Sequence, residues 1–371
     1  MRQLVLKTNI QKYGTVKEFV SELQIGKEDL VVTNKRMYGD IFAGCEEKPQ
    51  ALFRDDFGGG EPTDVMVEAL LQKVSGMEFK RIIGIGGGAV MDITKILAVS
   101  CGKPLQWMYD NKEKLVKRAP MILVPTTCGT GSEVTNIGVV NFLSRGQKIG
   151  LVSDEMFADT AALCPALLSG MPYSVFATSS IDALIHAIES VLSPGATDYT
   201  RIFGYQALDM IIYGYSMAQQ EGGKISNGLW DIFLTASNFA GISFGTAGNG
   251  AVHAMSFPLG GKYHIPHGES CYLVLDAVLK YYRENNTKPE LNILEHTLAE
   301  LFHCPEETAL EELDHFLSGV YPRKRLHEYG VTHEDIAEFA ANVISTQQRL
   351  LKNSYVPVDE DAVRSLYESV Y

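Results

Sequence analysis

The pattern of apolar and polar positions divides the chain into two halves. In the first half, short runs rich in β-branched residues alternate with stretches in which apolar residues recur every three or four positions. The runs predict strands and the stretches predict helices. Strands are expected at 29–34, 51–55, 81–86, 121–127 and 148–153, and helices at 62–75 and 89–100. Such alternation is typical of a parallel sheet covered by helices on both faces.

From about residue 172 the pattern changes to long windows with helical spacing and few strand signals. These windows are 173–192, 198–219, 227–245, 289–303 and 334–352. The change falls at "CPALLSGMP" (164–172), where two prolines and a glycine interrupt the pattern. A chain of 371 residues is also longer than one hydrophobic core usually serves. We therefore expect an α/β domain at 1–170 and an all-helical domain at 171–371.

Composition narrows the class of protein. Hydrophobic residues make up 46% of the chain and charged residues 21%, as in ordinary soluble proteins. The net charge of −13, without a run of Lys and Arg, argues against nucleic acid as a partner. The N-terminus has no apolar signal core, and no stretch reaches the roughly 18 apolar residues of a membrane span. We expect a cytoplasmic protein that binds no membrane. The six cysteines lie far apart, which predicts separately buried, reduced thiols.

The first candidate binding segment is "RIIGIGGGAVMDITK" (81–95), a predicted strand that runs through a glycine turn into a helix. Gly86, Gly87 and Gly88 would let the backbone approach a pyrophosphate, and the helix N-terminus favours an anion. A tight structural turn is the alternative. Asp92 can belong to this site or pair with Lys95 on the same helix face.

The second candidate segment, "PTTCGTGSEVT" (125–135), also follows a predicted strand. Its small and hydroxyl-bearing residues suit a loop beside a cofactor, and they equally suit a surface turn. Ligands of open α/β sheets collect at the carboxyl ends of the strands. That rule favours a cofactor role for Thr126, Thr127 and Thr130.

A third set of residues predicts a metal site. Asp182 and His186 lie four apart in a helical window, so both project from one face. "HAMSFPLGGKYHIPHG" (253–268) adds a cluster of histidines, and its glycines and prolines predict a shaped turn. Taken alone, Asp182 and His186 are explained as a helix acid and an incidental histidine. Together with His253 and His267 they can hold a divalent cation and leave a position for substrate.

These segments together resemble the iron-containing, group III alcohol dehydrogenase family. "GGGAVMDITK", "PTTCGTGSEVT", "DALIHAIES" and "HAMSFPLGGKYHIPHGE" follow one another in the order of the family's motifs. The resemblance implies a dinucleotide-binding α/β domain followed by an all-helical metal- and substrate-binding domain, a build shared with dehydroquinate synthase. It implies NAD as cofactor and one divalent metal, Fe²⁺ or Zn²⁺, held by Asp182, His186, His253 and His267. It also implies a homodimer or higher homo-oligomer.

The resemblance assigns further roles by position. Gly86, Gly87 and Gly88 would contact the pyrophosphate, Thr126, Thr127 and Thr130 other parts of the cofactor, and Lys148 would lie close to it. Phe257 stands where many members carry a histidine credited with proton relay, which makes His264 the candidate replacement. Asn34 stands in place of the acid that often binds the adenosine ribose, so NADP is not excluded.

Within the family, "FPLGGKYHIPHGES" is most similar to the form found in 4-hydroxybutyrate dehydrogenases. This resemblance implies interconversion of 4-hydroxybutyrate and succinate semialdehyde by hydride transfer. A carboxylate-bearing substrate should meet a cation, and Lys262 and Arg145 are the candidates. The alternatives are a dehydrogenase of the butanol or 1,3-propanediol type, a lyase similar to dehydroquinate synthase, and a scaffold protein without catalytic activity.

Overall fold

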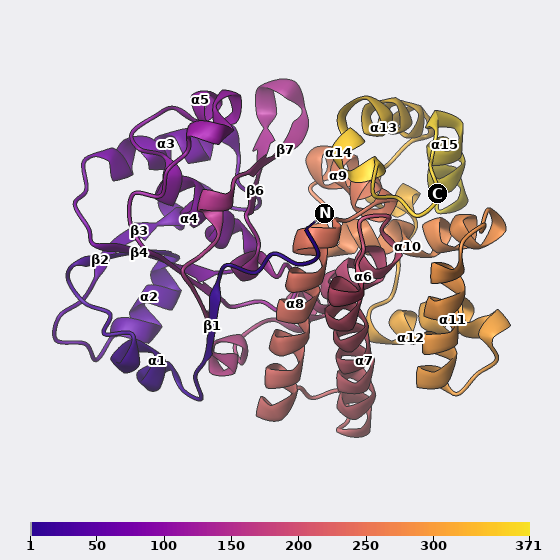
Figure 1. Cartoon of the computed structure of the whole chain (residues 1–371), viewed down its shortest axis with the longest axis horizontal. Coiled ribbons are helices and arrows are strands. Elements are labelled where there is room, and N and C mark those ends of the chain that lie inside the picture. Colours follow the sequence, from indigo (N-terminus) through magenta and orange to yellow (C-terminus); the bar gives the residue numbers. More distant parts are fainter. Residues whose placement is uncertain (1) are drawn as a thin grey trace. The chain divides into compact units, whose positions relative to one another are not determined.

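The structure of the chain is a computed structural model that describes residues 2–371. Contacts between residues divide it into two compact units (Figure 1). The first unit is Leu6–Met171. The second is Pro172–Tyr371 with the N-terminal segment that ends at Val5. The expected boundary at residue 170 lies next to this division.

The α/β unit is built on a six-stranded parallel sheet. In sheet order the strands are β1 (Asn9–Lys12), β8 (Thr160–Leu163), β5 (Met121–Pro125), β4 (Arg81–Gly86), β2 (Asp29–Thr33) and β3 (Gln50–Phe53). The parallel sheet expected from the sequence is confirmed. The run predicted at 148–153 lies outside it, because β7 (Gln147–Val152) pairs antiparallel with β6 (Ile137–Phe142) in a separate two-stranded ribbon.

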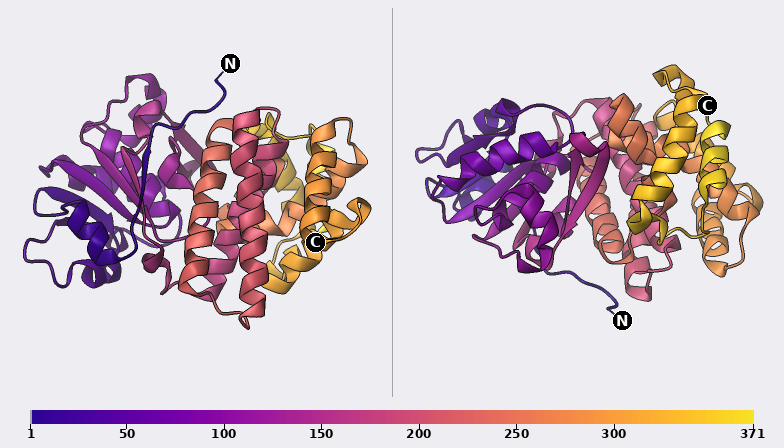
Figure 2. Two further views of the ribbon diagram at one scale, coloured as in Figure 1. Left: turned by 60° about the horizontal axis from the view of Figure 1, so that its bottom comes forward. Right: turned by 90° about the horizontal axis from the view of Figure 1, so that it is seen from above.

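Helices cover both faces of the sheet, and successive strand residues supply two cores. On β2, Leu30 and Val32 pack into one core with α3 (Asp64–Ser75), α4 (Gly88–Val99) and α5 (Leu105–Asp110). Val31 points to the opposite core, which includes residues of α1 (Val16–Glu22) and α2 (Lys35–Phe42). This alternation follows from the two-residue repeat of a strand. Figure 2 shows the sheet between its helices.

The order of the strands reverses direction between β2 and β4. The chain passes from β2 outward to β3, and then from β4 through β5 to β8 on the other side. Ligands of open parallel sheets bind at such a reversal, beyond the carboxyl ends of the strands. In this chain those ends carry Asn34, which follows β2, and Gly87, which follows β4.

The second unit is helical, as expected. Its helices are α6 (Tyr173–Leu192), α7 (Asp198–Gln220), α8 (Asn227–Ala247), α9 (Ala251–Tyr263), α10 (His267–Glu284), α11 (Pro289–Phe302), α12 (Ala309–Val320), α13 (His333–Thr346), α14 (Gln348–Leu351) and α15 (Glu360–Ser369). The helices α6, α7 and α8 pack against one another, and α10 packs on α6 and α9.

The central helix α6 is long and apolar enough to cross a membrane by composition alone. Its most apolar window is 89% buried by the helices around it. It also carries Asp182 and His186 in its middle. These features are those of the core helix of a folded domain.

The histidine segment differs from its prediction. Residues 253–263 were expected to form a shaped turn, yet they belong to α9, which contains Pro258 in its interior. Residues on every side of this helix are buried, so it shows no amphipathic stripe that a sequence pattern could reveal. The turn is confined to His264, Ile265 and Pro266, and α10 begins at His267.

Candidate functional site

The glycine turn joins β4 directly to α4. Gly87 occupies the N-cap position and provides no side chain to cap the first turn of the helix. Backbone amides at such a helix start, together with the helix dipole, form a site for phosphate. The geometry therefore fits the predicted pyrophosphate role of Gly86, Gly87 and Gly88.

The threonine loop, residues 125–135, lies against this turn. The Thr126 amide donates to the Gly86 carbonyl at 3.0 Å. A Cβ on Gly88 would come within 2.7 Å of Thr130 Cγ2, and one on Gly87 within 3.3 Å of Thr127 Cγ2. The two predicted cofactor segments thus meet at the carboxyl ends of β4 and β5, and glycine is needed where they touch.

Two side chains of α4, Lys95 and Asp92, hold the threonine loop in place through hydrogen bonds. Lys95 Nζ is fully buried and donates to Ser132 Oγ at 2.7 Å and to the Ile137 carbonyl at 2.8 Å. Asp92 accepts from Ser132 Oγ at 2.6 Å and from the Val139 amide at 2.9 Å. Asp92 also lies 3.7 Å from Lys95 Nζ, so the alternative pairing considered for it is present. These contacts give Asp92 a structural task beside the cofactor role predicted for it.

The burial of Lys95 has an electrostatic cost. Desolvation lowers the pKa of its ammonium to about 8, although Asp92 and Glu133 act in the opposite direction. The sequence pattern gave Lys95 no role beyond an ion pair. The sequence feature that could have indicated its role is its position on α4, one helical turn after Asp92.

Asn34 begins α2 as its N-cap. Its side-chain oxygen accepts from the Met37 amide at 2.7 Å. The neighbouring Lys35 forms an ion pair with Asp56, and its amide donates to Asp55 Oδ2 at 3.0 Å. Two carboxylates from the segment after β3, Asp55 and Asp56, therefore lie beside the end of β2.

Three helices of the second unit bring a cluster of donors together. Asp182 comes from α6, His253 from α9, and His267 and Cys271 from α10. Their donor atoms all lie within 4.8 Å of one another. Asp182 Oδ1 is 3.6 Å from His253 Nε2 and 3.8 Å from His267 Nε2. Three of the four predicted metal ligands therefore share one centre with a cysteine that the sequence pattern treated as a separate buried thiol.

His186, the fourth predicted ligand, lies beside this centre. Its Nδ1 is 3.9 Å from Asp182 Oδ2. Its ring is stacked between Phe244, at a centroid distance of 4.2 Å, and His253, at 4.4 Å. His186 thus adjoins the cluster through the other carboxylate oxygen of Asp182.

Glu189 orients His253. Its Oε2 lies 2.6 Å from His253 Nδ1, and its Oε1 accepts from the Val252 amide at 2.7 Å. With Nδ1 bonded to a carboxylate, the other ring nitrogen of His253 is presented to the cluster. This carboxylate–histidine arrangement is typical of metal sites. The sequence pattern gave Glu189 no role, although it lies seven residues after Asp182 on the same face of α6.

The cluster has the properties of a cation site. Within residues 2–371, Asp182 Oδ1 and His253 Nε2 are buried polar atoms without a hydrogen-bond partner. Such atoms are costly to bury unless something binds them. A carboxylate, two imidazoles and a thiol are donors that Zn²⁺ and Fe²⁺ both accept. The residues present therefore fit a divalent metal.

The donors of the cluster also shift one another's pKa values. Burial alone would lower the pKa of His267, but Cys271 and Asp182 raise it to about 9. Burial alone would raise the pKa of Cys271, but His253 and His267 lower it to about 7. Burial would likewise raise the pKa of Asp182, yet the imidazoles around it hold it below its ordinary value. The imidazoles and the acidic groups of the cluster thus stabilise each other's charged forms despite their burial.

Gly268 sets the distance between α10 and α6. A Cβ at this position would lie 2.1 Å from the Thr178 carbonyl oxygen and 3.0 Å from Asp182 Cβ. The backbone at the start of α10 therefore touches α6 directly. This contact places His267, the preceding residue, at the cluster.

The predicted catalytic residues Lys262 and His264 lie at the C-terminal end of α9. Lys262 Nζ contacts Asp335 Oδ1 at 2.6 Å and Glu338 Oε2 at 2.8 Å, so two carboxylates already compensate its charge. The structure gives no support to the prediction that Lys262 receives a substrate carboxylate. His264 is exposed at the end of α9 with a φ of 54°. Phe257 faces the cluster, its ring 6.1 Å from that of His267.

Lys148 lies on β7 in the α/β unit. It is buried and forms an ion pair with Glu61 at 2.6 Å. Its proximity to the cofactor stays a prediction.

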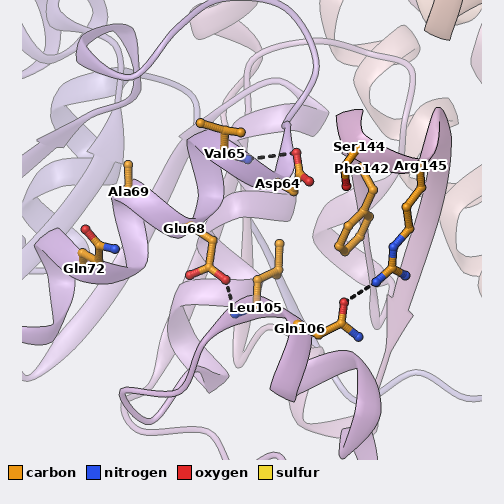
Figure 3. Close-up of a pocket in the computed structure, with 10 residues that line it drawn as sticks. All are labelled: Asp64, Val65, Glu68, Ala69, Gln72, Leu105, Gln106, Phe142, Ser144 and Arg145. Carbon is orange, nitrogen blue, oxygen red and sulfur yellow. Dashed lines mark hydrogen bonds between the residues drawn. The ribbon is translucent and has the colours of Figure 1, made fainter.

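A pocket of about 480 Å³ lies in the α/β unit between α3, α5 and the β6–β7 ribbon (Figure 3). Arg145 lines it, donates to Gln106 Oε1 at 2.5 Å and lies over the Phe142 ring at 5.1 Å. Asp64 and Glu68 also line the pocket. The Arg145 guanidinium therefore shares this pocket with two acids and none of the predicted metal ligands.

None of the six cysteines forms a disulfide bond within residues 2–371. Their burial is less uniform than the sequence suggested: Cys128, Cys164 and Cys271 are buried, whereas Cys101 is exposed.

Known proteins resemble the whole chain. Residues 7–165 match the family model "Iron-containing alcohol dehydrogenase", and residues 176–371 match "Fe-containing alcohol dehydrogenase family, C-terminal". A 4-hydroxybutyrate dehydrogenase of Clostridium kluyveri is 40% identical over 371 residues, which cover 100% of both chains. Long-chain-alcohol dehydrogenase 1 of Geobacillus thermodenitrificans is 32% identical over 79% of this chain and 75% of its own.

A solved structure shares the fold. Sulfoacetaldehyde reductase from Bifidobacterium kashiwanohense, in complex with NAD⁺, superposes with a TM-score of 0.84 at 23% identity, over 100% of this chain and 98% of its own. The two family models and the full-length relative agree with the order of motifs and with the two units of the fold. The chain belongs to the iron-containing alcohol dehydrogenase family.

Proposed function

We propose that this chain is a metal-dependent NAD(H) alcohol dehydrogenase that interconverts 4-hydroxybutyrate and succinate semialdehyde. The observation that carries the metal-dependent chemistry is the convergence of Asp182, His253 and His267 on one buried centre. The full-length identity of 40% to a 4-hydroxybutyrate dehydrogenase supports the substrate.

Asp182, His186, His253 and His267 would hold the metal, with Cys271 adjoining. When bound, Fe²⁺ or Zn²⁺ acts as a Lewis acid that favours the alkoxide of an alcohol or polarises an aldehyde. Glu189 keeps the imidazole of His253 oriented through the contact at Nδ1. Phe257 keeps one side of the cluster apolar, which limits the access of water to it.

Gly86, Gly87, Gly88, Thr126, Thr127 and Thr130 would hold NAD at the reversal of the strand order. Their contacts with one another support a single binding surface. NAD is favoured over NADP because Asp56 pairs with Lys35, which removes the cation best placed for a 2′-phosphate. Asn34 would contribute less than predicted, since its side-chain oxygen already caps α2.

Neutral primary alcohols are the alternative substrate class. The charge compensation of Lys262 by Asp335 and Glu338 favours this class, because the main candidate for binding a substrate carboxylate is already paired. One relative is named long-chain-alcohol dehydrogenase 1, and this name also points to alcohol substrates without a carboxylate.

Initial rates separate these possibilities. The full chain, loaded with Fe²⁺ or Zn²⁺, is assayed with 4-hydroxybutyrate, butanol and propane-1,3-diol, each with NAD and NADP. We expect kcat/KM to be highest for 4-hydroxybutyrate with NAD. Equal turnover of the neutral alcohols would overturn the substrate, since a carboxylate site rejects ligands that leave it unfilled. Metal binding without formation of reduced cofactor from any alcohol would favour a lyase or a scaffold.

We further propose that the enzyme works in the cytoplasm as a homodimer or higher homo-oligomer and binds neither nucleic acid nor membrane. The net charge of −13 agrees with the last two points. Light scattering on the purified protein measures the oligomeric state, and a monomer mass would contradict that part of the proposal.

A further inference from the structure

A substrate carboxylate needs a cation that the chain has not already paired with one of its own acids. Lys262 is held by Asp335 and Glu338. Arg145 lies in the α/β unit, in a pocket that contains none of the predicted metal ligands. Arg349 of α14 belongs to the helical unit, as the predicted metal ligands do. It is therefore a cation to consider for this role.

The guanidinium of Arg349 has no partner in the chain. Among residues 2–371, it forms no hydrogen bond, ion pair or ring contact with another residue. Every other arginine after residue 172 has such a contact through its guanidinium; these are Arg201, Arg283, Arg323, Arg325 and Arg364. Acids are abundant in a chain with a net charge of −13, so the lack of an acid at Arg349 is a local property.

The backbone of Arg349 lies beside the start of α9, the helix that carries His253. α14 packs against α9. The Asn353 side-chain amide joins the two segments, since its Nδ2 donates to the Asn249 carbonyl at 3.2 Å and to the Arg349 carbonyl at 3.4 Å. One nitrogen thus contacts both main chains. His253 follows Asn249 by four residues, in the first turn of α9.

A second contact brings the same segment close to the predicted metal ligands. A Cβ on Gly250 would lie 3.2 Å from the Asn353 carbonyl oxygen and 3.3 Å from Glu189 Oε1. Glu189 is the carboxylate that orients His253 through Nδ1. The segment that carries Arg349 therefore adjoins the residue that supports a predicted metal ligand.

The surroundings of Arg349 suit an anionic ligand. Its side chain is exposed, so a ligand can reach it from solvent. The protein around the guanidinium partly desolvates it and lowers its pKa, and no carboxylate of the chain acts in the opposite direction. A cation that is partly desolvated and unpaired gains more from an anion than a fully hydrated one does.

We propose that Arg349 binds the carboxylate of 4-hydroxybutyrate while the hydroxyl end of the substrate lies at the metal site. The inference rests on the proposed function and adds the residue that selects its substrate. A chain of three methylene groups separates the two ends of this molecule, so one substrate can contact two separate groups of the helical unit. The planar guanidinium can bind both carboxylate oxygens at once. Butanol has no group for this contact.

A matched pair of substrates tests the contact. The full chain, loaded with Fe²⁺ or Zn²⁺, is assayed with NAD and either 4-hydroxybutyrate or its neutral amide, 4-hydroxybutyramide. We expect Arg349→Met to lower kcat/KM for the acid by about 10- to 100-fold and to leave kcat/KM for the amide unchanged. Arg349→Lys keeps the charge without the planar fork and should give an intermediate value. Lys352→Met, a change of a neighbouring exposed cation, is the control and should behave as the wild type.

Chemical labelling provides a measurement on the wild type alone. Phenylglyoxal modifies accessible guanidinium groups, and mass spectrometry of the peptides locates the label. We expect butyrate, added with NAD to the metal-loaded chain, to protect Arg349. Arg364, which is exposed and paired with Glu360, should be labelled equally with and without butyrate. Equal labelling of Arg349 at butyrate concentrations that inhibit the enzyme would overturn the proposal.

These outcomes separate the proposal from the proposed function. If the wild type prefers 4-hydroxybutyrate and Arg349→Met keeps that preference, the role of Arg349 is overturned and the proposed function stands. If Arg349→Met loses activity equally with the acid and the amide, the side chain is structural, and the proposal is again overturned. A wild type that turns over 4-hydroxybutyrate no better than butanol overturns the proposed substrate and the role of Arg349 together.

Discussion

The carboxylate of Glu189 holds the imidazole of His253 through a contact of 2.6 Å between Oε2 and Nδ1. The two residues lie on α6 and α9, and each is nearly fully buried. Outer contacts of this kind fix the ring orientation of a ligating histidine and raise its basicity.

Glu189→Gln should therefore weaken metal binding. We expect the Kd for Zn²⁺ to rise by about 10- to 100-fold, because the amide keeps the shape of the side chain and loses its charge. Isothermal titration calorimetry measures this change. Glu300→Gln, at an exposed position of α11, is the control and should leave the Kd unchanged. Equal affinity of Glu189→Gln and wild type would show that Glu189 only packs against α9.

Gly88→Ala should impair cofactor binding and spare the metal site. The added methyl would lie 2.7 Å from Thr130 Cγ2, so the threonine loop must move. We expect the Kd for NAD to rise about tenfold, which corresponds to ~1.4 kcal/mol. Fluorescence titration with NADH and calorimetry with Zn²⁺ measure the two sites separately.

Two further variants sharpen this test. Thr130→Ser removes the colliding methyl, so the double variant should bind NAD more tightly than Gly88→Ala alone. Gly39→Ala, where nothing lies within 4 Å of the new Cβ, should bind NAD as the wild type does. Normal NAD affinity in Gly88→Ala would remove the glycine turn from the cofactor site.

Lys95 should give the stability of the protein a distinctive dependence on pH. Burial lowers its pKa from 10.5 to about 8 in the folded chain. Between these two values the unfolded chain binds more protons, so the free energy of unfolding rises with pH across this window. The contribution of Lys95 should increase by at most about 3 kcal/mol.

Urea unfolding at about pH 7 and about pH 10 measures the effect, provided that each variant is compared with the wild type at the same pH. Lys95→Met loses the hydrogen bonds to Ser132 and Ile137 and should be less stable throughout. The gap to the wild type should widen as the pH rises. Lys73→Met, at an exposed position, should show a constant difference. A constant gap for Lys95→Met would mean that its pKa is not lowered.

Lys262→Ala should change stability and not substrate recognition. Lys262 is 45% exposed and joins α9 to α13 through Asp335 and Glu338, so water screens its ion pairs. We expect a loss of about 1 kcal/mol or less in the free energy of unfolding. The KM for 4-hydroxybutyrate should remain that of the wild type. A large rise in KM with no effect on butanol would restore Lys262 as the carboxylate-binding residue.

His264→Gly distinguishes a capping role from proton relay. His264 has a φ of 54°, which costs about 1–2 kcal/mol for a residue with a Cβ and little for glycine. The variant should unfold at a higher temperature and keep its metal. Retained kcat with 4-hydroxybutyrate would exclude proton relay, and a strong fall in kcat with normal metal content would establish it.

The sequence pattern predicted the central strands of the sheet and most of the long helices of the second unit, although it missed α10. The runs at 29–34, 81–86 and 121–127 became β2, β4 and β5, because central parallel strands are buried on both faces. β1 and β8 were missed, because each is only four residues long and β1 has a polar sequence. α9 was missed because its glycines and Pro258 usually indicate a turn. In this helix they stand among residues that are buried in the core of the unit.

The candidate site could be predicted as far as residue type and spacing carry chemistry. Asp182 was identified because His186 follows it by one helical turn, and His253 and His267 because they belong to a cluster of three of the chain's nine histidines. Cys271 and Glu189 were not, since a cysteine or a glutamate in a helix has a common structural explanation and only the packing of α6, α9 and α10 shows which groups face each other. The pairing of Lys262 with α13 likewise depends on a contact 73 residues along the chain.

The contact of Gly268 with the Thr178 carbonyl has a consequence for engineering this enzyme. The distance between Asp182 on α6 and His267 at the start of α10 is set by the main chain, because the backbones of the two helices touch at Gly268. Libraries that reshape the substrate pocket should therefore keep glycine at position 268, because any larger residue would push the two helices apart and displace the cation.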